Sequence, residues 1–193
     1  MRFYFLFIFN FSLLIACFSQ TNEEVQQHKT GSGGVSAQVY PAGYIIAVYV
    51  DLSRTTKTSF LIRTGWNFID RKDFSHYNDH EEGNGIGMGV SYRRHFFLHK
   101  GEIMAAINTD VWNEWIDWEN NIGQINQASG KTYTLVLQPW LETGYFTGVN
   151  KSSLKYGITA GFGREINVVT DGKDVGQGWI LSGLLHLQYL IKK

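Results

Sequence analysis

The sequence predicts an all-β fold, an eight-stranded antiparallel up-and-down transmembrane β-barrel, on three observations. Apolar and polar residues alternate along most of the chain with the two-residue period of strands, and the 3.6-residue period of helices is rare. Aromatic residues make up 15% of the chain, with 21 Gly and only 2 Pro, a composition typical of β-proteins. The links between strands alternate between short and long, as in barrels that cross a membrane.

The first three predicted strands follow from this alternation. Segments 35–40 and 44–52 are joined by residues 40–43 (Tyr-Pro-Ala-Gly), which suit a tight turn because Pro fixes φ and Gly allows positive φ. Segment 58–69 alternates most clearly. It places aromatic and aliphatic residues on one face and small or polar residues on the other.

The other five predicted strands repeat the pattern. Segment 84–96 alternates Gly with apolar residues, and 101–117 places Asn, Asp and Glu on one face. Segments 132–146 and 153–166 each place Tyr, Leu or Ile on one face. Segment 178–191 alternates over its whole length, so it is predicted to be the last strand.

The lengths of the links predict the orientation. The short links are 53–57, 97–100 and 147–152, and the long polar links are 70–83, 118–131 and 167–177. Outer-membrane barrels have short periplasmic turns and longer extracellular loops. The last strand then ends in the periplasm, and strand 44–52 runs from the outside to the periplasm. A chain whose N-terminus lies in the periplasm therefore needs one more strand before it, which segment 35–40 supplies.

The N-terminus is predicted to be a targeting segment. Residues 1–19 hold one charge, Arg2, followed by an apolar run and small residues, which is the layout of a cleaved secretory signal peptide. Cys17 also fits a bacterial lipobox, in which it would carry a lipid, and the sequence leaves that alternative open. We expect 20–34 to be a flexible lead and 35–193 to be the barrel domain.

Composition excludes several classes of protein. The 193 residues include 17 Lys and Arg and 17 Asp and Glu, so the formal net charge is +0. This balance excludes a strongly basic nucleic-acid-binding protein and an acidic disordered tail. The single Cys cannot form a disulfide framework or a cysteine-based zinc site. We expect no cofactor and no nucleic-acid partner.

Two sets of aromatic residues on the apolar face are expected to lie at the two lipid interfaces. The first set is Tyr44, Trp66, Trp115, Tyr133 and Trp179, and the second is Phe60, Tyr92, Tyr145, Tyr156 and Tyr189. At roughly 3.3 Å per residue and a tilt near 45°, the distance between the sets is about 23–28 Å, the height of an outer-membrane apolar band. A soluble barrel gives no reason for this sorting.

The opposite face is expected to line the barrel interior. It carries a predicted polar network of Arg63, Arg93, Asp110, Glu114, Glu142, Lys155, Glu165 and His186. An eight-stranded barrel is just wide enough to be filled by its own side chains. We therefore interpret this set as a structural network, with neither an open pore nor an active site.

The long link 70–83 contains the candidate binding residues outside the cell. These are His76, Asp79, His80, Glu81 and Glu82, whose oxygen and imidazole groups could bind a cation or a partner. No EF-hand or HExxH spacing is present. We therefore predict an ordinary solvated loop with no metal site, and a divalent-cation site is the alternative.

The architecture of residues 34–193 resembles the small eight-stranded outer-membrane barrels of Gram-negative bacteria, the class that includes the OmpA transmembrane domain and OmpX. The stretch 71–83 (RKDFSHYNDHEEG) is similar to one in uncharacterised barrel proteins of Bacteroidetes. Such barrels usually end in an aromatic residue, and residues 189–193 (YLIKK) depart from that pattern.

Three functions remain open at the level of the sequence. We expect a non-enzymatic outer-membrane barrel, monomeric and surrounded by outer-membrane lipid, with a structural or surface-interaction role for its extracellular loops. The alternatives are a lipid-modifying enzyme of the same fold and a soluble periplasmic barrel that binds an apolar ligand. We expect no enzyme, because Ser182 and His186 face inward while His95 and His99 lie at the periplasmic end.

Overall fold

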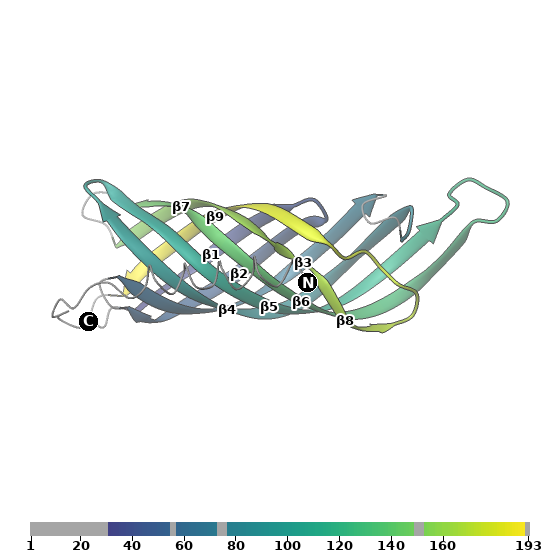
Figure 1. The fold of residues 1–193 in the computed structure, drawn as a ribbon, viewed down its shortest axis with the longest axis horizontal. Coiled ribbons are helices and arrows are strands. Elements are labelled where there is room, and N and C mark those ends of the chain that lie inside the picture. The colour runs from purple at the N-terminus through teal and green to yellow at the C-terminus, as the bar shows by residue number, and fades with distance from the viewer. Residues whose placement is uncertain (1–30, 55–56, 73–76, 149–152, 192–193) are drawn as a thin grey trace, which may run out of the picture.

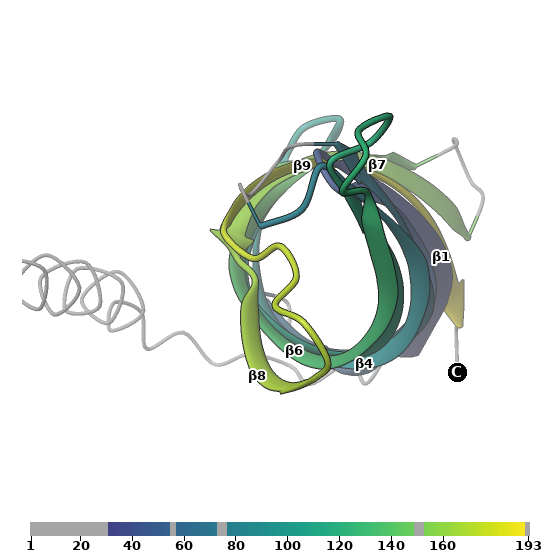
Figure 2. The ribbon, with the colours of Figure 1, turned by 90° about the vertical axis from the view of Figure 1, so that its right-hand side faces the viewer.

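In the computed structural model, which describes residues 31–54, 57–72, 77–148 and 153–191, the chain closes into an antiparallel β-barrel (Figure 1). The strands are β1 (Gly31–Tyr40), β2 (Gly43–Arg54), β3 (Thr58–Lys72), β4 (His80–Leu98), β5 (Gly101–Asn120), β6 (Ala128–Gly148), β7 (Leu154–Arg164), β8 (Ile166–Asp171) and β9 (Trp179–Ile191). Neighbours in the ring pair antiparallel, and β1 pairs with β9 to close it. The end-on view shows this ring (Figure 2).

The ring has eight strand positions, as predicted. β7 and β8 are two parts of one wall strand, because both pair with β6 and only Glu165 separates them. β7 also pairs with β9, whereas β8 continues past the start of β9 and pairs with β6 alone among the described residues. The all-β, antiparallel, up-and-down prediction is therefore confirmed.

The predicted start of the barrel was four residues too late. β1 begins at Gly31 rather than Val35, because Ser32 and its neighbours pair with β2 on one side and β9 on the other. This segment is small and polar and therefore lacks the apolar alternation of a strand. The predicted signal peptide over 1–19, its Cys17 and residues 20–30 of the predicted lead lie outside the described residues.

The three long links are shorter than predicted. β3, β4, β5 and β6 continue into them, and β8 occupies the first part of 167–177. The added rungs of β3, β4, β5 and β6 are mostly polar and include pairs of opposite charge, such as Arg71 opposite Glu81 and Asp117 opposite Lys131. Polar strands outside the apolar band carry no hydrophobic signal, so the sequence could not distinguish them from loops. Figure 1 shows the β5–β6 hairpin extending well beyond the other strands.

The tight turn between β1 and β2 forms as predicted. Gly43 has a φ of 144°, in the region that favours glycine, and a Cβ there would overlap the Phe68 carbonyl of β3.

The distribution of side chains is the reverse of that in a soluble domain. Apolar residues on the outside are exposed and polar residues inside are buried: Leu185 is 60% exposed and the next residue, His186, is 5% exposed. All ten aromatic residues predicted for the lipid interfaces point outward, nine of them exposed and Tyr133 half-buried. Among the described residues, no helix is long and apolar enough to cross a membrane.

Candidate functional site

The eight residues predicted for the interior network all point inward. Seven are buried, and the side chain of Lys155 is 18% exposed near one opening of the barrel. Seven of the eight residues form three groups along the barrel rather than one site, and Lys155 belongs to a fourth, with Glu102, at the end opposite the long hairpins.

The middle group blocks the barrel. The Arg63 guanidinium forms a double hydrogen bond and ion pair with Asp110, and Trp140 Nε1 donates to the same carboxylate at 2.6 Å. The guanidinium also lies over the Trp140 ring, 4.7 Å from its centroid. A buried arginine needs such a partner, and here the pair and the indole fill the interior.

The second group surrounds Glu142. Its carboxylate is 3.0 Å from His186 Nε2, accepts a hydrogen bond of 2.7 Å from Thr159 Oγ1 and is 3.7 Å from Arg93. These donors come from β7, β9 and β4, so the group ties different sides of the ring together. Charge-assisted bonds of this kind satisfy a buried carboxylate.

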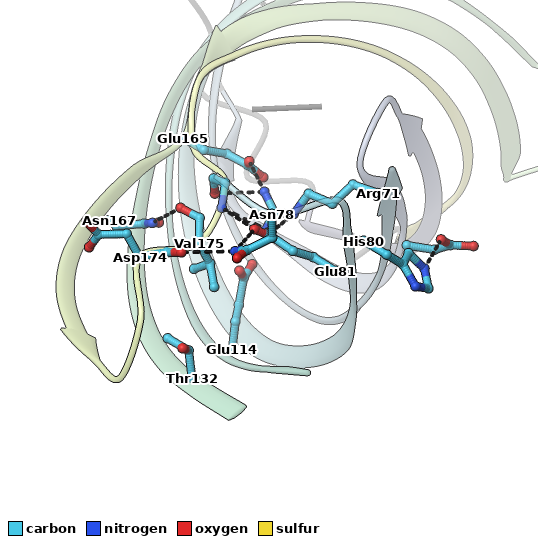
Figure 3. Close-up of polar contacts among 12 residues, drawn as sticks. Arg71, Asn78, His80, Glu81, Glu114, Thr132, Glu165, Asn167, Asp174 and Val175 are labelled. Atoms are coloured by element: carbon cyan, nitrogen blue, oxygen red, sulfur yellow. Dashed lines mark hydrogen bonds and ion pairs between the residues drawn. The ribbon is translucent and has the colours of Figure 1, made fainter. Parts of the chain in front are cut away.

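The third group lies at the mouth and includes a residue that the sequence analysis missed, Arg71 (Figure 3). Arg71 lies 2.9 Å from Glu81 and 3.4 Å from Glu165, and it donates to the carbonyl of Gly176 at 2.8 Å. Asn78 donates to Glu81 at 2.7 Å and to the carbonyl of Asp174 at 3.0 Å. The hydrogen bonds and ion pairs therefore converge on residues 172–178, which we call the strap.

The strap folds into the mouth of the ring (Figure 2). Val175 is fully buried and packs with Ile69 and Ile116. The Gly176 amide donates to the Glu81 carboxylate at 3.0 Å, and Thr132 Oγ1 donates to the Lys173 carbonyl at 2.8 Å. One buried apolar side chain and several hydrogen bonds thus hold the strap across the opening.

The predicted binding residues of 70–83 are not brought together as one site. Glu81 points inward to Arg71, whereas Glu82 is exposed and His80 lies 3.2 Å from Asp70 on the outside. Asp79 accepts a long bond from the Ile122 amide at 3.4 Å, and His76 lies outside the described residues. The part of the chain that the structure describes contains no group of three or more His, Cys, Asp or Glu that could hold a metal ion.

The two-residue alternation of β3 could have identified Arg71, because Arg71 continues the inward-facing series of Arg63 and Asn67. Arg71 was instead predicted to lie in a loop, where inward and outward positions do not alternate. For the strap there was no such signal, since its contacts with Arg71 and Glu81 join residues about a hundred positions apart.

No protein-family model matches the sequence, and no curated protein is significantly similar to it. Among solved structures, the chain is similar to the crystal structure of Neisserial surface protein A, with a TM-score of 0.49 and 9% identity over 85% of this chain and 96% of that one. It is also similar to the N-terminal β-barrel domain of Pseudomonas aeruginosa OprF, with a TM-score of 0.42 and 10% identity over 85% of this chain and 100% of that one.

Proposed function

We propose that the protein is an integral barrel of the bacterial outer membrane whose extracellular end has a non-enzymatic, surface-interaction role. The observation that carries the proposal is the apolar outer surface. Leucine, isoleucine and valine side chains face outward on every side of the ring, and Leu181, Leu185 and Ile158 are each at least 60% exposed. In water such a surface would promote aggregation, whereas contact with lipid stabilises it.

The filled interior supports a role at the surface rather than transport. The Arg63–Asp110 pair with Trp140 occupies the middle of the barrel, and the strap covers one end. It also disfavours the soluble alternative, because an apolar ligand would have to displace buried ion pairs. We therefore propose that an extracellular ligand or protein binds at the hairpins that extend from the strap end of the barrel.

The β5–β6 hairpin is the strongest candidate for that contact. Its tip, residues 121–127, carries Ile122 and Ile125, which are 51% and 110% exposed beyond the end of the ring. Loops on a rigid scaffold are where binding residues are commonly found. The Gram-negative origin, the resemblance of 71–83 to Bacteroidetes barrels, secretion by an N-terminal signal and a monomeric state remain predictions of the sequence.

The test is a surface-labelling experiment. An epitope tag inserted at Gln124 should be detected on intact cells, and the protein should fractionate with the outer membrane and migrate faster on a gel when it is not boiled. Asn78, although it lies in a long link, is unsuitable for a tag because it is buried and hydrogen-bonded to Glu81. A tag that is detected only after the outer membrane is permeabilised would contradict the proposed orientation.

A further inference from the structure

At the end of the barrel opposite the strap, three neighbouring strands bring a serine, a histidine and a glutamate into a chain. Ser59 of β3 places its Oγ 2.9 Å from Nε2 of His95 in β4. The other ring nitrogen of His95, Nδ1, lies 3.3 Å from the Glu102 carboxylate of β5. Lys155 of β7 lies 3.2 Å from the second oxygen of that carboxylate, Oε2.

This is the order of groups that activates a serine: a hydroxyl on one imidazole nitrogen and a carboxylate near the other. His95 Nδ1 lies at ion-pair distance from Glu102 without a hydrogen bond, and catalytic groups commonly align fully only when substrate binds. We infer that Ser59 is a nucleophile for carboxylic esters, with His95 as its general base and Glu102 orienting the imidazole. The inference goes beyond the proposed function and does not depend on it, because it concerns the other end of the barrel and can be tested in detergent.

Arg93 is a cation on the strand next to Ser59, and its guanidinium also lies 3.7 Å from Glu142 and over the Tyr49 ring. It lies directly opposite Ser59 in the register of β3 and β4 and is buried. Its Nε has no hydrogen-bond partner among the described residues. A buried donor of this kind beside a serine can stabilise the negative oxygen that forms when an ester carbonyl is attacked.

Access to the site runs past Phe97. Ser59 is only 2% exposed, whereas Phe97 is 55% exposed and its ring centroid lies 6.4 Å from that of His95, in a stacked arrangement. A substrate therefore reaches the hydroxyl by displacing this ring. Because Ser59 and His95 are both buried, small esters can reach them more readily than lipids can.

In the reaction, Ser59 Oγ bonds to the ester carbonyl carbon as its proton moves to His95 Nε2. The bond to the alcohol oxygen then breaks, and His95 returns the proton to that alcohol. Water attacks the acyl-serine and gives a proton to His95, which passes it back to Ser59 as the carboxylic acid leaves. No oxidant, reductant or metal is needed.

The test uses the full barrel, folded in detergent, with a fluorophosphonate probe and p-nitrophenyl acetate. Wild type should take the label on Ser59 and hydrolyse the ester, and Ser59→Ala should lose the label and about 100-fold or more of the rate. Ser182→Ala is the matched control, because Ser182 is also a buried inward serine but lies outside this chain of groups. Folding of each variant is checked by its faster migration without boiling.

Two further variants separate a catalytic from a structural role. Glu102→Gln should lower kcat with little change in KM, because it disturbs the orientation of His95 and not ester binding. Phe97→Ala should increase the labelling rate by opening the entrance. If folded wild type and Phe97→Ala both remain unlabelled, or if Ser59→Ala is labelled as fast as wild type, the inference is wrong.

Discussion

Arg71 links two carboxylates from distant parts of the chain to the strap. It is buried with Glu81 and Glu165, and Gly176 provides a carbonyl as well as an amide to the same cluster. A buried ion pair contributes little net stability compared with an apolar replacement, but removal of one member leaves an uncompensated charge. The free energy of unfolding should therefore respond strongly to truncation of this one side chain.

We expect Arg71→Ala to destabilise the barrel by about 3–5 kcal/mol, because it leaves two buried carboxylates without their cation. The measurement is urea unfolding in detergent micelles, followed by tryptophan fluorescence. Lys131→Ala is the control, because it removes an ion pair with Asp117 whose side chains are 84% and 63% exposed, and such pairs contribute almost nothing. Equal losses of unfolding free energy in the two variants would mean that burial does not set how much an ion pair contributes.

The outward face of the barrel leads to a second prediction, which concerns a single residue. Leu185→Arg should destabilise the inserted barrel by about 2–4 kcal/mol if the position lies near the bilayer midplane. Unfolding from lipid vesicles measures this effect. Gln124→Arg, at the exposed tip of the β5–β6 hairpin, introduces the same charge outside the apolar band and should leave the unfolding free energy unchanged. A tolerated arginine at 185 would mean that this face does not contact lipid.

Among the strands, the close contact of β7 with β6 depends on the absence of a side chain. Gly163 lies against Trp140, whose indole fills the middle of the barrel, and a Cβ at 163 would overlap the Trp140 side chain. Gly183 of β9 faces outward, and a Cβ there would meet nothing within 4 Å. Gly163 and Gly183 therefore provide a crowded test position and an open control position in adjacent strands.

Gly163→Ala should destabilise the barrel by about 1–3 kcal/mol through overpacking. Gly183→Ala should be neutral or stabilising by about 0.5–1 kcal/mol, because alanine loses less backbone entropy than glycine in a strand. Both are measured by unfolding in detergent micelles. The same response from both variants would show that the contact with Trp140 does not limit the packing of β7.

The strands that cross the apolar band could be predicted from sequence because lipid-facing and interior residues alternate along each strand there. The end of β3 at Lys72 could not, since polar rungs outside the band have no such alternation. β8 beyond Ile166 could not either, because the adjacent Val168 and Val169 are both exposed and break the alternation. The strap was also hidden, because Val175 is a single apolar residue in a polar link. Ser59 and His95 are 36 residues apart, and only the register of β3 and β4 brings them together.

The whole molecule is a closed ring with its polar groups inside and its apolar groups outside. Its interior contains four separate polar groups, the fourth of them at Ser59, His95 and Glu102, so loss of one need not open a continuous passage. The same ring joins the first and last strands: β1 pairs with β9, and Gln188 Nε2 donates to Ser32 Oγ at 2.6 Å.

That seam between β1 and β9 determines when the protein can finish folding. The two hydrogen-bonded residues are 156 positions apart, so the ring cannot close until the chain through β9 has been synthesised. Until then β1 has an open edge, and an open edge in an apolar sheet invites aggregation. A nascent chain of this kind depends on being kept apart from other copies of itself, and a chain that lacks β9 would form an open sheet rather than a smaller barrel.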